Sequence, residues 1–161
     1  MAELNKSHNF YALIMSGGRG ERFWPLSTEL KPKPFLPLFH GKSLIQLTVE
    51  RIHRFFPLSS IFLILAKEHY PIALQQLSSI PEKNFIVEPC GKDTAPCAAY
   101  ATLYISKMHP DPTIIIFPSD HHIEDEKKFI RCIQNSFLLE QKRCIRKSPT
   151  SSHPSLDSSR G

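Results

Sequence analysis

Cysteine pairs in the spacing that binds zinc are missing from this sequence. It has four cysteines, at positions 90, 97, 132 and 144, and none of them forms a C-x-x-C pair. Structural zinc sites are usually built from such pairs. Their absence argues against a zinc site and predicts thiols that are reduced and partly buried, as in cytosolic proteins.

Long apolar runs are missing as well. No stretch approaches the roughly 20 apolar residues that cross a membrane. The first six residues, Met1 to Lys6, lack the apolar centre of a signal peptide. The sequence therefore predicts a cytoplasmic protein without a membrane partner. Its 161 residues and its 41% hydrophobic content suit one globular domain.

Two familiar glycine motifs are incomplete. The pattern G-x-G-x-x-G, started at Gly18, needs a glycine where Phe23 stands, and a P-loop ending at Gly41 needs one where Leu36 stands. The sequence also shows no recognisable Ser-His-Asp or Cys-His pattern of a catalytic nucleophile and its base. The sequence thus excludes these two nucleotide motifs and does not indicate catalysis through a protein nucleophile.

Net positive charge is small outside the last residues. The net charge is +5, but residues 140–161 alone hold five Lys or Arg against two Asp or Glu. A nucleic-acid binder would carry a basic stripe on a folded face. The charge therefore argues against a nucleic-acid partner, although a basic tail that binds RNA stays as a distant alternative.

Strand and helix signals alternate along the chain. Apolar runs predict strands at 10–15, 61–65, 85–87 and 113–117, and residues 23–42 are proline-rich and predict a long ordered loop. Helices are expected from Ser43, around Pro71, from Asp93 or Thr94, and from about Asp125 to Leu139. This order predicts an α/β, Rossmann-like fold, a mostly parallel sheet with helices on both faces. Ligands bind such sheets at the carboxyl ends of the strands.

The most informative segment is the glycine-rich turn S-G-G-R-G-E-R at 16–22, directly after the first predicted strand. Glycine allows left-handed dihedrals and a close approach of backbone to ligand. Successive N–H groups then form an anion site, to which arginine side chains add charge. The turn predicts a di- or triphosphate ligand; the alternative is a tight strand-to-helix turn that binds nothing.

Three further segments carry candidate site residues, each with a plainer alternative. Lys33 lies between Pro32 and Pro34, whose fixed backbone could hold its side chain toward a phosphate. The alternative is a solvated proline-rich loop that binds no ligand. Asp120 follows the fourth strand and suits Mg²⁺, or it caps the next loop. The segment E-P-C-G-K-D-T-A-P at 88–96 leads into a helix and either reads a purine edge or caps that helix. Adjacent residues 121 and 122 are histidines that face opposite ways and are not expected to share a metal.

Together these segments resemble the mannose-1-phosphate guanylyltransferases, a branch of the sugar-nucleotide pyrophosphorylases. The resemblance lies in S-G-G-R-G-E-R-F-W-P-L-S at 16–27, K-P-K-P-F-L at 31–36, the 88–96 segment, and P-S-D-H-H-I at 118–123. It covers about residues 10–137. The first motif is shared across sugar-nucleotide transferases, and the others are more specific. The resemblance implies a nucleotide-diphospho-sugar transferase fold and the conversion of GTP and mannose 1-phosphate into GDP-mannose and pyrophosphate.

The resemblance also implies a role for each matching residue. Gly17, Gly18 and Gly20 would cradle the GTP phosphates, and Glu88, Thr94 and Ala95 would contact the base. Catalytic Arg22 and Lys33 would bind phosphate oxygens and offset the charge of departing pyrophosphate, and Asp120 would be a ligand of the cofactor Mg²⁺. Such direct displacement at phosphorus needs no protein nucleophile, and fixed cations must offset the repulsion between two anions.

The sequence departs from the family pattern at several points. Many members have Gln at the position of Pro34 and Asn at that of Asp93. The family chain continues further, with a sugar-phosphate pocket and a second metal carboxylate. We therefore expect residues 8–139 to be the nucleotide-binding part, truncated, and 140–161 to be a disordered serine-rich tail foreign to the fold, as a frameshift or premature stop would produce.

The resemblance leaves three functions open for such a chain. As a part of a guanylyltransferase it would turn over weakly or not at all alone. A related transferase would use another nucleotide or another hexose 1-phosphate. A non-catalytic module would bind a nucleotide without reaction.

Overall fold

The computed structural model describes residues 9–17, 25–28, 31–89, 93–121 and 123–147, the last eight of these by their backbone alone. The chain divides into two compact units, Met1–His122 and Ile123–Gly161. The first unit holds the sheet, and the second is described separately below. The predicted boundary between residues 139 and 140 stays a prediction.

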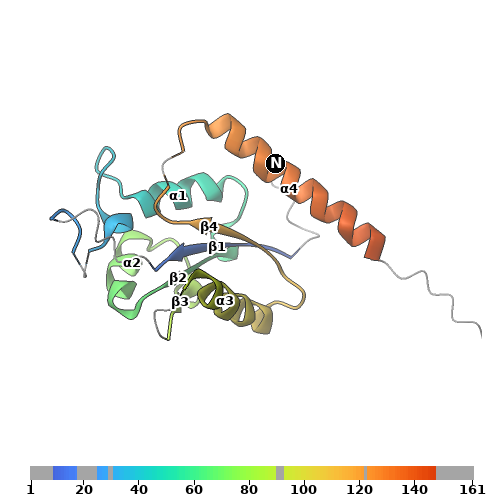
Figure 1. The fold of residues 1–161 in the computed structure, drawn as a ribbon, viewed down its shortest axis with the longest axis horizontal. Coiled ribbons are helices and arrows are strands. Elements are labelled where there is room, and N and C mark those ends of the chain that lie inside the picture. Colours follow the sequence, from blue (N-terminus) through green and yellow to red (C-terminus); the bar gives the residue numbers. More distant parts are fainter. Residues whose placement is uncertain (1–8, 18–24, 29–30, 90–92, 122, 148–161) are drawn as a thin grey trace, which may run out of the picture. The chain divides into compact units, whose positions relative to one another are not determined.

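The first unit is built on a four-stranded sheet in the order β3-β2-β1-β4 (Figure 1). The strands are β1 (Phe10–Ser16), β2 (Ile61–Leu65), β3 (Phe85–Val87) and β4 (Thr113–Pro118). Every pairing is parallel. All four predicted strands are confirmed, with β1 and β4 each one residue longer at the carboxyl end. The α/β class is likewise confirmed, and β1 proves to be the neighbour of β4.

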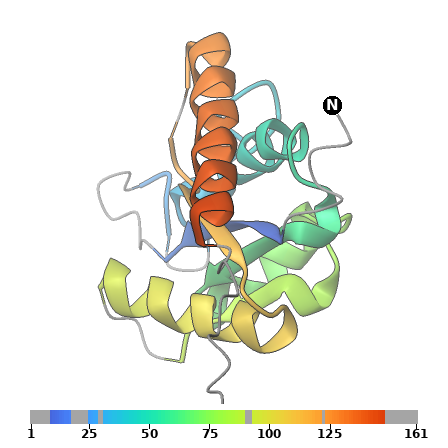
Figure 2. The ribbon, with the colours of Figure 1, turned by 90° about the vertical axis from the view of Figure 1, so that its right-hand side faces the viewer.

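Helices cover both faces of this sheet, as predicted. They are α1 (Leu44–His53), α2 (Tyr70–Gln76) and α3 (Thr94–Met108). The α1 and α3 helices lie on opposite sides of the strands (Figure 1 and Figure 2). Strands covered on both faces bury all their side chains, which explains the uninterrupted apolar runs at 10–15 and 61–65.

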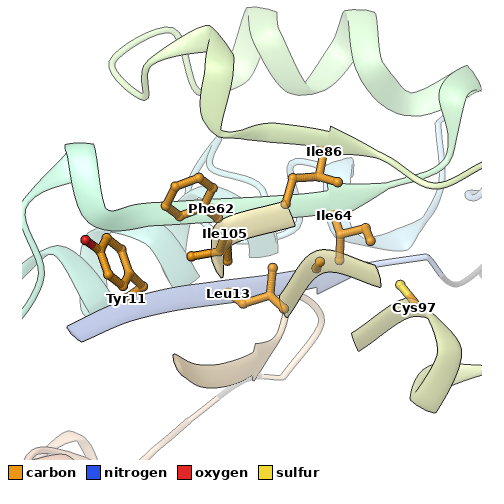
Figure 3. Packing of buried hydrophobic residues seen from close by; sticks show 8 residues of the cluster. Tyr11, Leu13, Phe62, Ile64, Ile86, Cys97 and Ile105 are labelled. Carbon is orange, nitrogen blue, oxygen red and sulfur yellow. The ribbon is translucent and has the colours of Figure 1, made fainter. Parts of the chain in front are cut away.

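The hydrophobic core between α3 and the sheet is formed by alternate residues of the strands. It takes every second residue of β1 and β2 and the inward stripe of α3 (Figure 3). Its members are Tyr11, Leu13, Phe62, Ile64, Ile86, Cys97, Ala101 and Ile105. The residues between them, such as Ala12 and Ile14, are also buried and face the other side of the sheet.

The predicted capping box starts α1. The Ser43 hydroxyl accepts from the backbone N–H of Gln46, and the Gln46 side chain accepts from the backbone N–H of Ser43. The α2 helix has its predicted proline in the first turn. At α3 the N-cap is Asp93, whose side chain makes no capping hydrogen bond.

Part of the predicted proline-rich loop is a short 3₁₀ turn, η2 (Lys33–Phe35). Gln76, at the end of α2, ties this turn to the helices. Its amide nitrogen donates to the Phe35 carbonyl at 3.0 Å, and its side-chain oxygen accepts from the Ser43 hydroxyl at 2.6 Å. Phe35 itself is fully buried. The loop is therefore anchored at the point from which Lys33 extends.

A second buried amide joins the start of β3 to β2. Asn84 is inaccessible to solvent, and its Nδ2 donates to the carbonyl of Ser59 at 3.0 Å and to that of Ile61 at 2.9 Å. These bonds satisfy two carbonyls where β2 begins. They fix the register of the short strand β3, which has few ladder bonds of its own.

The second unit contains the helix α4 (Glu126–Lys147). Asp125 starts it as predicted, because its Oδ1 accepts from the backbone N–H of Lys128 at 2.9 Å. The predicted end at Leu139 is wrong. Residues 140–147 are mostly Glu, Gln, Lys and Arg, which favour helix and include no Gly or Pro. The rest of the predicted tail lies outside the described residues.

Within the residues described, no helix combines the length and the apolar character that a membrane crossing requires.

Candidate functional site

The carboxyl ends of three strands meet at one edge of the sheet. The ladder continues beyond the strand ends, since Ser119 N–H donates to the Met15 carbonyl at 3.2 Å and Glu88 N–H to the Leu65 carbonyl at 2.9 Å. Gly17 follows β1, and Asp120 follows the neighbouring strand β4. The structure thus places the start of the glycine turn beside the segments that hold Asp120 and Glu88.

Lys33 and Asp120 form an ion pair at this edge. The distance between Lys33 Nζ and Asp120 Oδ2 is 3.6 Å, and the side chains are 25% and 44% exposed. A pair this exposed contributes little to folding stability. Breaking this ion pair therefore costs little free energy, so Lys33 could bind an anion and Asp120 a cation in its place.

Asp120 supplies a single carboxylate at this edge, so a magnesium ion there would need further oxygen ligands from a bound molecule or from water. Among the described residues there is no group of three or more His, Cys, Asp or Glu that could hold a metal. Mg²⁺ commonly takes one or two carboxylates and completes its shell with water and phosphate oxygens. His121 is exposed, and its Nε2 lies 3.9 Å from Asp120 Oδ1. Whether the two histidines share a metal is untested, since residue 122 lies outside the described part.

Glu88 lies against the first glycine of the turn. A Cβ built on Gly17 would lie 3.6 Å from Glu88 Oε2, which is an ordinary contact, and Gly17 does not have a positive φ. The left-handed conformation expected of the turn is therefore not adopted at Gly17. Alanine would fit there, so the proximity to Glu88, not backbone freedom, is the structural property of this position.

Cys97, on α3, lies beside the Glu88 carboxylate. Burial, the charge of Glu88 and a hydrogen bond to its side chain together raise the pKa of the thiol from 9.0 to about 11. The thiol therefore stays protonated through the mildly alkaline range as well as at neutral pH, and its hydrogen can be donated to Glu88. Sequence reasoning treated Cys97 only as a buried thiol and missed this contact.

We expect Cys97 to resist alkylation in the folded protein while exposed Cys132 reacts. At pH 8 a thiol with a pKa near 11 is only about one part in a thousand thiolate, and the thiolate is the nucleophile. Peptide mapping after iodoacetamide treatment measures both sites, with urea-unfolded protein as the control in which both react. Equal alkylation rates of Cys97 and Cys132 in the folded protein would contradict the contact between Cys97 and Glu88.

The raised pKa also predicts a pH dependence of stability. Because the folded state binds the thiol proton of Cys97 more tightly than the unfolded state, the free energy of unfolding should fall as the pH rises from 9 through 11.

The remaining predicted site residues divide into two groups. Thr94 and Ala95 lie exposed in the first turn of α3, close in sequence to the Cys97 that touches Glu88. Arg22, Gly18 and Gly20 lie outside the described residues. Whether Arg22 shares a cavity with Asp120 thus stays a prediction.

The sequence predicted no role for two residues that bear on this candidate site. Gln76 anchors the turn that carries Lys33, and no local pattern signals a contact with Phe35 across the chain. Ser16 ends β1 with a buried hydroxyl. Its signal was available, since it is a polar residue at the end of an otherwise apolar strand and directly precedes the glycines.

Comparison with known proteins gives a consistent result. The model of the Nucleotidyl transferase family matches residues 11–143. Mannose-1-phosphate guanylyltransferase 2 of Escherichia coli O157:H7 is 36% identical over 129 residues, which are 78% of this chain and 27% of the relative. The xanthan biosynthesis protein XanB of Xanthomonas campestris is 40% identical over 119 residues, 73% of this chain and 25% of that protein.

A solved structure from Thermus thermophilus, named as a mannose-1-phosphate geranyltransferase, superposes with a TM-score of 0.67 at 35% identity. The match covers 79% of this chain and 37% of the solved one. The chain thus spans about a quarter of the length of the two curated relatives.

Proposed function

Because the chain belongs to the nucleotidyl transferase family, we propose that it is the nucleotide-binding part of a mannose-1-phosphate guanylyltransferase. The ligand would be GTP with Mg²⁺, and the reaction partner mannose 1-phosphate. The observation that carries the proposal is the 3.6 Å pair of Lys33 and Asp120 at the strand edge, beside the start of the glycine turn. A cytoplasmic location, expected from the sequence, goes with this proposal.

In the proposed complex, positive groups hold the triphosphate. The Lys33 ammonium turns from Asp120 to the phosphate oxygens, and Arg22 adds a forked pair of donors. Gly17, Gly18 and Gly20 offer backbone N–H groups to the same oxygens. The carboxylate of Asp120, freed from Lys33, would hold Mg²⁺ together with the phosphates.

The reaction is a displacement at the α-phosphorus of GTP. A phosphate oxygen of mannose 1-phosphate attacks, a new P–O bond forms, and the bond to the β-phosphate breaks to release pyrophosphate. Bound Mg²⁺ would neutralise phosphate charge and orient the leaving group. Lys33 and Arg22 stabilise the negative charge that gathers on the departing pyrophosphate, and no residue of the chain forms a covalent bond.

The base would be read at the start of α3. The Glu88 carboxylate, held by the Cys97 thiol, can accept from N1–H and the exocyclic amine of guanine, which adenine cannot offer in that arrangement. Thr94 and Ala95 would supply backbone and hydroxyl contacts from the first helical turn. This choice of base distinguishes the proposal from a transferase that uses ATP, UTP or dTTP.

Calorimetric titration tests the proposal. GTP with Mg²⁺ should bind the purified chain more tightly than ATP, UTP or dTTP under the same conditions, and stronger stabilisation in a thermal-shift assay should follow by linkage. Equal binding of all four would favour a related transferase of different specificity, and no binding would refute the proposal.

A pyrophosphate-release assay with GTP, Mg²⁺ and mannose 1-phosphate separates the catalytic alternatives. Since the chain spans about a quarter of its curated relatives, we expect weak or no turnover by the chain alone, because both reactants must be held in line. Binding without turnover supports a nucleotide-binding part; robust turnover would show that these residues suffice for catalysis.

A further inference from the structure

We infer that the hydroxyl of Ser16 is a further ligand-binding group, which donates a hydrogen bond to a phosphate oxygen of the bound nucleoside triphosphate. The inference rests on the proposed function and gives a role to the first residue of the S-G-G-R-G-E-R segment, to which the sequence assigned none. It starts from a buried polar group without a hydrogen-bond partner at the end of a strand.

The Ser16 hydroxyl is buried and has no partner. The residue is 2% exposed, and its Oγ makes no hydrogen bond among the residues that the structure describes. Buried hydroxyls nearly always have a partner, because losing water without compensation is costly. Because Thr48 carries the same cost in the middle of α1, an unpartnered hydroxyl indicates a ligand only where its position gives a further reason.

The position of Ser16 supplies that reason. Tyr11, Leu13 and Met15 pack with the core on the α3 side, so by alternation Ser16 faces the opposite side of the sheet. That side is covered by α1 (Figure 1), and η2, the turn that contains Lys33, packs against α1. Ser16 is also the last residue of β1 and directly precedes Gly17.

A second buried hydroxyl without a hydrogen-bond partner occurs in the helix α1. Thr48 lies in the middle of α1, is 3% exposed, and its Oγ1 also has no partner among the described residues. It lies within a helix and not at the end of a strand. Thr48 therefore serves as a matched control for the effect of an unpartnered hydroxyl on stability alone.

The test combines two measurements on Ser16→Ala and on the control Thr48→Val. In the ligand-free protein both variants should raise the thermal midpoint, because each removes a buried polar group without a partner. In calorimetric titration Ser16→Ala should weaken binding of GTP with Mg²⁺ by about fivefold to tenfold, the effect of one hydrogen bond. Thr48→Val should leave that affinity unchanged.

Each outcome decides something different. A lower midpoint for Ser16→Ala would reveal a partner in the ligand-free protein, such as a bound water, and would overturn the inference. Wild-type affinity in this variant would overturn it as well. Inorganic tripolyphosphate with Mg²⁺ serves as a second titrant. If tripolyphosphate binds through Ser16 while GTP does not bind, the proposed function fails and the contact of Ser16 with phosphate stands without the nucleotide; if neither ligand binds, both fail.

Discussion

Replacing Asp120 by asparagine should weaken the binding of GTP with Mg²⁺ about tenfold or more and should not weaken the binding of metal-free GTP. The carboxylate is proposed to hold the cation, so its loss removes that bond, and asparagine keeps the shape without the charge. Without metal, the same carboxylate faces a polyanion and competes with it for Lys33, 3.6 Å away. Its removal should then leave affinity unchanged or raise it. Titrations in Mg²⁺ and in EDTA measure both.

Lys33→Met should give a different pattern. In the proposed complex the ammonium contacts the phosphates with or without metal, so affinity should fall in both titrations. Neither variant should change the thermal midpoint of the ligand-free protein much, since an ion pair this exposed contributes no more than about 1 kcal/mol. An equal loss with and without Mg²⁺ for Asp120→Asn would contradict its role as a metal ligand.

Glu50→Gln is the matched control for this pair of variants. Glu50 is an exposed carboxylate on α1 that pairs with Lys42 at 2.7 Å. The substitution removes the same charge by the same chemical change, and it breaks an ion pair that the proposed site does not use. Nucleotide affinity should stay at the wild-type value, which separates a local effect at Asp120 from a change in net charge.

The strands and the helix starts could be predicted because their signals are local. Runs of apolar residues, the box at Ser43 and the proline of α2 act within a few residues of chain. The end of α4 lies beyond the predicted one, because residues 140–147 are polar, as in a solvated tail, and are also good helix formers. The adjacency of β1 and β4 could not be predicted, since strand order depends on how the crossovers pack.

For the candidate site, the sequence indicated residue types and not the contacts between them. The sequence indicated Lys33 and Asp120 separately, but their pairing depends on the position of η2, which the amide of Gln76 fixes from a distant part of the chain. The contact between Glu88 and Cys97 and the buried hydroxyl of Ser16 likewise arise only from tertiary packing. A single sequence contains no local signal for such contacts.

The largest expected effect on stability is that of Asn84→Asp. The amide nitrogen of Asn84 lies 2.9–3.0 Å from two carbonyl oxygens, those of Ser59 and Ile61, in a place without solvent access. Aspartate has the same shape, but it would place an oxygen where the donor was, facing two other oxygens. The protein must then bury an unpaired charge or protonate the carboxyl, and we expect a loss of about 3–5 kcal/mol. That is a large part of the roughly 5–15 kcal/mol that typical domains possess.

Asn9→Asp provides the comparison for that experiment. The Asn9 amide also donates to a carbonyl, that of Pro110 at 2.8 Å, but the residue is exposed. Water can solvate the new carboxylate there, so the free energy of unfolding in urea should change by about 1 kcal/mol or less. Equal losses in the two variants would mean that burial is not what makes Asn84 important. Acidification should also narrow the gap between Asn84→Asp and wild type, because a protonated carboxyl can again donate to one carbonyl, whereas the exposed site should respond little.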